Sequence, residues 1–334
     1  MLNRSGFNLT SIHCPVDTTL FVRYVGTTVV ILGYIGNFLS IYIFSRKALR
    51  TRSCSWLFLA LAISNCFVLT GYTTESLLLH GYYIKVLSHW SLCKMVIFLI
   101  YASTDISNYL LTAAAIDRCI AVNCISARHT FCKPKIAKCE ILFLIIIMSF
   151  INAHFLFGFH MDKKKNCSPK KHQYEIFFIH HYDSYVDIIK SILIPFTIMI
   201  ICNLIIIFRL FRKLPITIKH KKSQRRQEKD RQLTLCLVIT SFIFFILTLP
   251  SEVNDFLRSK INQKSQEKYV CQLWFLTTVL IIIYQINYAS HFYIYTLTGS
   301  IFRKELKKIC FLKERHYLYS EYHKRNSIIE QYPY

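Results

Sequence analysis

The stretch MVIFLIYASTDISNYLLTAAAIDRC, residues 95–119, ends with the charged pair Asp117-Arg118. Its mostly apolar part, residues 95–117, is long enough to cross a bilayer as a helix, which takes about 20 residues. An arginine at the centre of such a helix costs about 2.5 kcal/mol or more, whereas near a helix end its side chain reaches the membrane surface. Asp117 can also neutralise Arg118 as an ion pair. The stretch therefore predicts a membrane-spanning helix that closes with a charge pair.

Six further apolar blocks of similar length flank this one, and together they decide the fold class. Hydrophobic residues make up 53% of the 334 residues, and the mean hydropathy is +0.35. Backbone polar groups must be satisfied internally in lipid, so long apolar blocks form helices there. We therefore predict an all-α membrane protein, a bundle of seven transmembrane helices. The seven blocks are residues 24–45, 56–79, 95–117, 139–159, 186–208, 233–257 and 270–297.

Basic residues are concentrated in alternate connections between the blocks, within a net charge of +23. No acid accompanies them between the first and second blocks or in residues 119–138, after the third, and the densest run is residues 209–231. The positive-inside rule makes these connections cytoplasmic and places the N-terminus outside. We predict a multi-pass plasma-membrane protein whose basic runs contact anionic membrane lipid rather than nucleic acid.

Modification sites are expected near both ends of the chain. Asn3 and Asn8 each begin an Asn-x-Ser/Thr triplet, the acceptor for N-linked glycosylation, on the predicted outer tail. After the last block, residues 303–312 are basic and amphipathic, which favours a short eighth helix along the inner membrane surface. Cys310 in this segment is a candidate for palmitoylation. The alternative is an unmodified thiol.

Several short motifs occur in a fixed order along the blocks. They are Gly36-Asn37, Leu61-Ala62-Ile63-Ser64-Asn65, Asp117-Arg118-Cys119, Pro195, Pro250, Tyr295 and the turn at residues 298–303. Their order and spacing resemble those of rhodopsin-like G-protein-coupled receptors over residues 24–311. The resemblance implies a receptor that binds an extracellular ligand and activates a heterotrimeric G protein, with arrestin as a further partner. It implies no enzyme, no cofactor and no metal site. The corresponding regions are an outer tail (1–23), a receptor domain (24–302), helix eight (303–312) and an inner tail (313–334).

The chain departs from the family pattern at the switch positions. Asn65 stands where the family has an aspartate, and the helix-seven motif reads His291-Phe292-Tyr293-Ile294-Tyr295 without its proline. Ser107 and Asn287 match the other sodium-site positions of the family. We therefore expect a sodium site without its charge, in which Asn65 and His291 hydrogen-bond each other or water. The altered helix-seven ending resembles that of invertebrate neuropeptide receptors, including the FMRFamide-like group.

Thirteen cysteines occur in the chain, and four of them lie on the predicted outer side. The resemblance implies a disulfide between Cys93, at the start of the third helix, and Cys167, in the second outer loop. The oxidising exterior permits such a bond. Cys14 and Cys271 remain, and they are candidates for a second bond between the outer tail and the seventh helix.

The resemblance also assigns residues to a cytoplasmic switch. These residues are Asp117, Arg118, Asp230, Phe244, Pro250 and Tyr295. Asp230 begins the sixth helix, where an acid can pair with Arg118 and hold the inactive state. The alternative is an ordinary acid at a helix N-terminus, where the helix dipole stabilises negative charge.

Acids at the outer helix ends indicate a cationic ligand. They are Glu75, Asp183, Asp187, Glu252 and Asp255. The family positions for an amine-binding aspartate and a retinal lysine hold Ile100 and Gln285, which argues against biogenic amines and light. An arginine-containing, amidated peptide fits, since guanidinium binds carboxylates bidentately, and Tyr101, Tyr284 and Gln285 are expected nearby. The alternative is internal pairing of the acids, for example with Lys190, Arg258 or His181.

Other functions stay open at this point. A receptor that signals without ligand, or no longer signals, is one alternative, because the switch residues are altered. A transporter would need broken helices and an internal repeat, neither of which the sequence contains. A membrane enzyme would need a cluster of nucleophiles or metal ligands, and the thirteen histidines are scattered.

Overall fold

The computed structural model describes residues 18–47, 49–162, 167–170, 173–212, 221–260, 267–299 and 302–308. Inside these ranges it does not describe the side chains of residues 125–126, 179–180, 183–184, 210–212, 221–230, 233, 258–260 and 267–271. Predictions for Asn3, Asn8, Cys14 and Cys310, and for the side chains of Asp183, Asp230, Arg258 and Cys271, therefore fall outside the described residues.

Seven of the described helices are long and apolar enough to cross a membrane, which confirms the predicted fold class. In chain order they are built from α1 (Thr18–Phe21), η2 (Val22–Gly26) and α2 (Thr27–Phe44); α3 (Ser53–Tyr72) and η3 (Thr73–Gly81); α4 (Trp90–Asn123); α6 (Pro134–Asn152) and α7 (Phe155–Gly158); η6 (Ile189–Leu193) and α9 (Ile194–Arg212); α10 (Lys221–Lys260); and α11 (Glu267–Thr298). Between them lie η4 (Val86–Ser88), α5 (Ile125–Phe131), β1 (Phe159–Met161), β2 (Cys167–Pro169), α8 (Gln173–Ile176) and η5 (Phe177–Val186).

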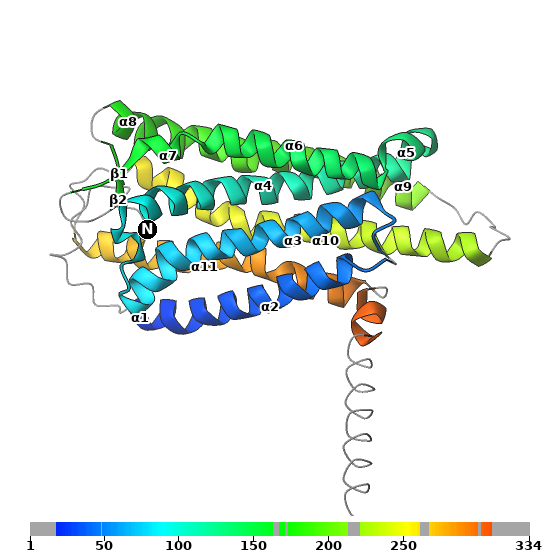
Figure 1. Ribbon diagram of the computed structural model, residues 1–334, viewed down its shortest axis with the longest axis horizontal. Coiled ribbons are helices and arrows are strands. Elements are labelled where there is room, and N and C mark those ends of the chain that lie inside the picture. The colour runs from blue at the N-terminus through cyan, green and yellow to red at the C-terminus, as the bar shows by residue number, and fades with distance from the viewer. Residues whose placement is uncertain are drawn as a thin grey trace, which may run out of the picture.

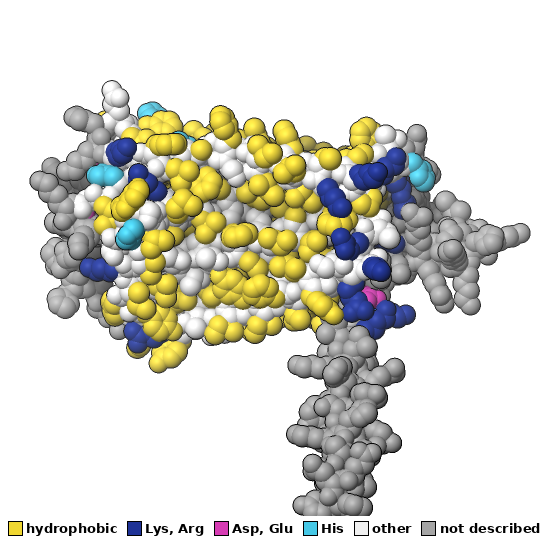
Figure 2. All heavy atoms as spheres, viewed as in Figure 1, with side chains coloured by type: hydrophobic (Ala, Val, Ile, Leu, Met, Phe, Trp, Pro, Cys, Tyr) yellow, Lys and Arg dark blue, Asp and Glu magenta, His cyan; other side chains and the backbone are white. Residues whose placement is uncertain are grey.

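The long helices run side by side, with α5 and residues 302–308 at one end of the bundle and the β1–β2 hairpin at the other (Figure 1). Hydrophobic side chains cover the middle of the bundle, and Lys and Arg side chains gather at its two ends (Figure 2). On α6 the exposed residues include Leu142, Phe143, Ile146 and Phe150. A surface this apolar is rare on a soluble monomer, and here it is the lipid-facing band of a membrane protein.

The third spanning helix, α4, lies at the centre of the bundle. It packs against α3, α6, α9 and α10, and 72% of its most apolar 18-residue segment is buried, the largest share among the described spans. The small side chains of Ala113, Ala114 and Ala115 are buried in this contact. Small residues let helix backbones approach closely within a membrane. Polar residues on α4 are therefore placed where they can reach several helices.

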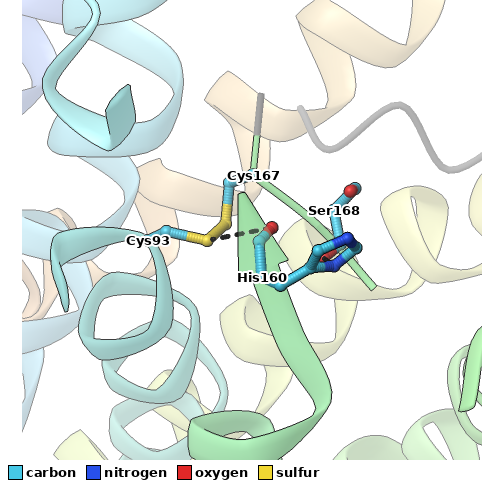
Figure 3. The surroundings of a disulfide bond; sticks show 4 residues. All are labelled: Cys93, His160, Cys167 and Ser168. Carbon is cyan, nitrogen blue, oxygen red and sulfur yellow. Dashed lines mark hydrogen bonds between the residues drawn. A yellow bond between two sulfur atoms is a disulfide. The ribbon is translucent and has the colours of Figure 1, made fainter. Parts of the chain in front are cut away.

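At the end of the bundle that the sequence predicts to face outside, here called the outer end, a disulfide joins α4 to the hairpin (Figure 3). Cys93 lies in the first turn of α4, and Cys167 is the first residue of β2. The strands β1 and β2 are antiparallel, with Met161 opposite Cys167, and His160 Nδ1 lies 3.2 Å from the carbonyl oxygen of Ser168. The predicted bond is confirmed, and it holds the hairpin over the outer end of the central helix.

Residues 302–308 are helical and lie at the opposite end of the bundle, which the sequence predicts to face the cytoplasm and which is here called the inner end. Phe302 is buried, whereas Lys304 and Lys307 are exposed, as an amphipathic surface helix requires. Glu305 pairs with Arg46 at 3.3 Å, which joins this helix to the end of the first span. Arg303 Nη1 donates to the carbonyl oxygen of Leu297 at 2.6 Å, so a cation caps the end of α11.

Candidate functional site

The charge pair at the inner end of α4 is buried. Arg118 is 4% exposed and Asp117 is 8% exposed. Arg118 donates from Nε and Nη2 to Asp117 Oδ2, at 2.9 and 2.5 Å. Its Nη2 also lies 3.5 Å from Ser53 Oγ on α3. The aspartate neutralises the guanidinium locally, as the sequence predicted, which makes an arginine tolerable among packed helices.

Aromatic side chains close the bundle beside this pair. Tyr295 on α11 lies between Phe44, Phe58 and Phe302, with ring centroids 5.6, 5.0 and 5.8 Å away. Its hydroxyl is buried and has no hydrogen-bond partner among the described residues. Phe244 on α10 is fully buried in the same core. Tyr295 and Phe244, two of the predicted switch residues, therefore pack at the inner end.

Halfway along the bundle, Asn65 joins three helices. Its Nδ2 lies 2.8 Å from His291 Nδ1 on α11, and Ser107 Oγ on α4 donates to its Oδ1 at 2.6 Å. Asn37 on α2 donates to the carbonyl oxygen of Tyr288 at 3.0 Å and so joins the first and seventh spans. The expected contact between Asn65 and His291 is present, and every group that Asn65 contacts here is neutral.

These bonds determine the tautomer of His291. Asn37 Nδ2 donates to the carbonyl oxygens of Gly33 and Tyr288, so its Oδ1 is left to accept from Asn65 Nδ2, 3.5 Å away. The Asn65 amide therefore presents its N–H also to His291, whose Nδ1 must then accept. The ring proton therefore lies on Nε2, which is buried and has no partner among the described residues. Both polar side-chain atoms of Asn287 are likewise buried and unpartnered within the described part of the chain.

A second polar cluster, centred on Lys190, lies among α4, α6, η5 and η6. Lys190 Nζ is 2.5 Å from Asp105 Oδ2 and 3.3 Å from Asp187 Oδ1. It is also 2.9 Å from the Tyr182 hydroxyl and 3.1 Å from Asn152 Oδ1. Asp105 is only 1% exposed. One buried lysine thus holds two carboxylates, and the ionised cluster carries a net charge of −1.

A chain of hydrogen bonds extends this cluster to the seventh span. Ser191 Oγ donates to Asp105 Oδ1 at 2.6 Å, and the Ser191 carbonyl accepts from Asn108 Nδ2 at 2.9 Å. The Tyr288 hydroxyl then donates to Asn108 Oδ1 at 3.2 Å and lies 3.0 Å from the Tyr284 hydroxyl. A continuous network of polar contacts therefore links the third, fourth, fifth and seventh spans through the middle of the bundle.

Comparison with known protein families agrees with this arrangement. The profile of the family described as 7 transmembrane receptor (rhodopsin family) matches residues 36–286. The chain belongs to this family. The receptor is therefore a multi-pass membrane protein of the G-protein-coupled class, and members of this family are signalling receptors rather than enzymes. No curated protein matches the receptor, so no relative of known ligand supports the neuropeptide resemblance.

The predicted ligand residues of the receptor occupy different environments. Asp187 pairs with Lys190, so this acid follows the alternative of internal pairing rather than ligand contact. Tyr101 is buried and stacks on Phe155 at 4.2 Å, inside an aromatic cluster, so its ring is covered in this conformation. Glu75 is buried on η3. The remaining predicted ligand residues are the half-buried Glu252 and Asp255 on α10 and the buried Gln285 on α11.

Glu252 lies near aromatic hydroxyls. Its carboxylate interacts electrostatically with Tyr284 and Tyr288 on α11, and Tyr284 packs edge-to-face on Tyr72 at 5.6 Å. The sequence predicted roles for Glu252 and Tyr284 separately, and in the structure the two residues interact. The pairing of Lys190 with Asp105 was not predicted from the sequence. The available signal was a lysine and an aspartate, each inside an apolar block and each too costly to bury alone.

The neutral contacts of Asn65 predict that sodium has little effect on the receptor. Replacing choline chloride by sodium chloride at equal ionic strength should leave the melting temperature of the purified receptor unchanged. Asn65→Asp should introduce a sodium-dependent rise, because a cation bound at ten times its Kd stabilises by about 1.4 kcal/mol. Asn65→Gln is the matched neutral control. A sodium-dependent rise in the unmodified receptor would contradict the prediction.

Proposed function

We propose that the receptor lies in the plasma membrane with its N-terminus outside, binds a cationic peptide and activates a heterotrimeric G protein. The observation that carries the signalling part is the buried Asp117–Arg118 pair at the inner end of the central helix. Such a pair is stable while the bundle is closed. An outward movement of α10 would let Arg118 leave Asp117 and contact a G protein.

The switch would be a population shift. The ligand must bind the open state better than the closed one, since equal affinity for both states shifts nothing. Pro250 lies inside α10 and removes one backbone hydrogen bond, which gives this helix a place to bend. Phe244 is buried below it and would move with the helix. Asp230 as a partner of Arg118, and arrestin binding by the inner tail, belong to the same proposal.

The charge distribution supports a cationic ligand. Lys190 already neutralises part of the charge on Asp187. Glu252 and Asp255 lie on one face of α10, three residues apart. A guanidinium can bind a carboxylate there through two parallel hydrogen bonds. We therefore favour a peptide with an amidated Arg-Phe end, and assign its arginine to Glu252.

G-protein activation in cells that express the receptor tests this function, with a panel of amidated Arg-Phe peptides. Glu252→Gln should raise the half-maximal peptide concentration about 30-fold or more, because truncating one partner of a desolvated charge pair typically costs about 2–5 kcal/mol. Glu175→Gln, at the outer end on α8, is the matched control and should have little effect. Arg118→Gln should abolish activation and leave peptide binding largely intact.

The outcomes separate the ligand from the signalling role. Activation by a neutral lipid with no loss in Glu252→Gln would overturn the peptide assignment and leave the receptor function standing. Ligand-independent signalling is the second candidate, because the neutral Asn65–His291 contact replaces the charged site of the family. It predicts high basal activation in the same cells without peptide, again abolished by Arg118→Gln.

A further inference from the structure

Two cations flank one tryptophan at the inner end of the bundle. Trp56 lies in the first turn of α3, and its Nε1 donates to the carbonyl oxygen of Arg50 at 3.0 Å. The Arg50 guanidinium carbon is 4.8 Å from the centre of the Trp56 ring, and Lys138 Nζ, from α6, is 4.2 Å from the same centre. The indole therefore holds two positive charges within a few ångströms of one point.

No described carboxylate neutralises either cation. Arg50 and Lys138 are both exposed, and within the described residues neither makes an ion pair with a carboxylate. A cation–π contact at an exposed site contributes only about 0.5–1 kcal/mol and leaves the charge in place. Both charges lie close to the same indole ring, 4.8 and 4.2 Å from its centre, so an anion that contacts both beside the ring would stabilise the arrangement.

The surroundings identify the kind of anion. Lys138 is followed one turn later on α6 by Leu142, which is 59% exposed, and Trp56 is followed on α3 by Ile63, which is 42% exposed. These apolar residues belong to the lipid-facing band, whereas the two cations lie at its inner border. Tryptophan is enriched at this level of a membrane. An occupant must therefore be anionic at one end and apolar at the other.

We propose that Arg50, Trp56 and Lys138 bind the headgroup of an anionic phospholipid of the inner leaflet. The phosphate contacts both cations beside the indole, and an acyl chain runs past Leu142. Basic pockets between transmembrane helices on the cytoplasmic side are suited to such headgroups. The site joins the inner ends of α3 and α6, and it does not depend on the identity of the ligand or of the G protein.

Fluorescence of Trp56 can test the proposal directly. The chain has three tryptophans, and the other two, Trp90 and Trp274, lie toward the outer ends of α4 and α11. With Trp90→Phe and Trp274→Phe, the remaining signal comes from Trp56. The full chain would be placed in nanodiscs that contain a small fraction of brominated phosphatidylserine or, in parallel, the same fraction of brominated phosphatidylcholine. Bromine quenches tryptophan on contact.

The brominated phosphatidylserine should quench Trp56 more strongly, with an enrichment of about fivefold for each cation. Arg50→Gln with Lys138→Gln should make the two lipids equal. Lys133→Gln with Lys135→Gln, which removes the same charge at the same end, should preserve the difference. Millimolar inorganic phosphate should not abolish it, because a free anion lacks the acyl chain.

Equal quenching by the two lipids in the parent protein would overturn the proposal. So would a preference that survives in the Arg50/Lys138 variant, or one that free phosphate removes. Native mass spectrometry of the chain with all three tryptophans gives a second measurement if the phenylalanine variants fold poorly. Bound phosphatidylserine should then be lost in the Arg50/Lys138 variant and retained in the Lys133/Lys135 variant, and retention in both would contradict the site.

Discussion

Lys190→Met should lower the free energy of unfolding of the bundle by about 3–5 kcal/mol, the usual cost of breaking a buried ion pair. The change leaves the carboxylate of Asp105 without its cation, at 1% exposure and inside the membrane. Asn152 and Tyr182 would also lose the ammonium group that they now contact. Methionine fills a similar volume, so the loss reports on charge rather than on packing.

A double-mutant cycle measures this pair. The melting temperature of the purified receptor in detergent should fall strongly in Lys190→Met and in Asp105→Asn, and the double variant should be more stable than additivity predicts. Lys94→Met, which removes an outer lysine that lies over Trp90, is the matched control and should have little effect. Additive losses in the double variant would show that the two charges do not stabilise each other.

Cys93→Ala should destabilise the outer end of the receptor by about 2–5 kcal/mol, the range for loss of a native disulfide. The bond closes a sequence separation of 74 residues, so its loss frees a long loop in the unfolded chain. The β1–β2 hairpin would also lose its covalent tie to α4. Surface expression and the melting temperature should both fall.

Further cysteine substitutions and thiol labelling provide the controls for this prediction. Cys167→Ala should match Cys93→Ala, and the double variant should be no worse than either, because both changes remove one bond. Cys139→Ala, at an exposed free cysteine of α6, should be silent. Labelling of Cys93 and Cys167 by a thiol reagent in the intact, non-reduced receptor would contradict the assignment.

The spanning helices could be predicted from the sequence because a bilayer permits so few backbone structures. The predicted block 56–79 falls within the span Ser53–Gly81, and the block 95–117 falls within Trp90–Asn123. The disulfide and the sodium-site positions followed from the family resemblance rather than from local chemistry. The contact of Asn65 with His291, 226 residues away, was expected on the same ground.

The pairing of buried charges could not be predicted in the same way. Lys190 and Asp105 are 85 residues apart, and the five outer acids that the sequence offered as partners for lysine did not include Asp105. Which carboxylate the lysine meets depends on the rotation and depth of two helices, and many packed side chains determine these together. Tyr101 illustrates the same limit, since it was expected near a ligand and lies stacked on Phe155.

The sequence by itself therefore determined the seven-helix architecture, the family and the charge pair at Asp117-Arg118. Hydropathy, basic-residue bias and motif order are properties of short segments, and each can be evaluated without its neighbours in space. Only the tertiary structure decided that Lys190 pairs with both Asp105 and Asp187, that His291 carries its proton on Nε2, and that Arg50 and Lys138 flank Trp56. These features depend on distances of a few ångströms between different helices, and hydrogen bonds and ion pairs form only at such distances.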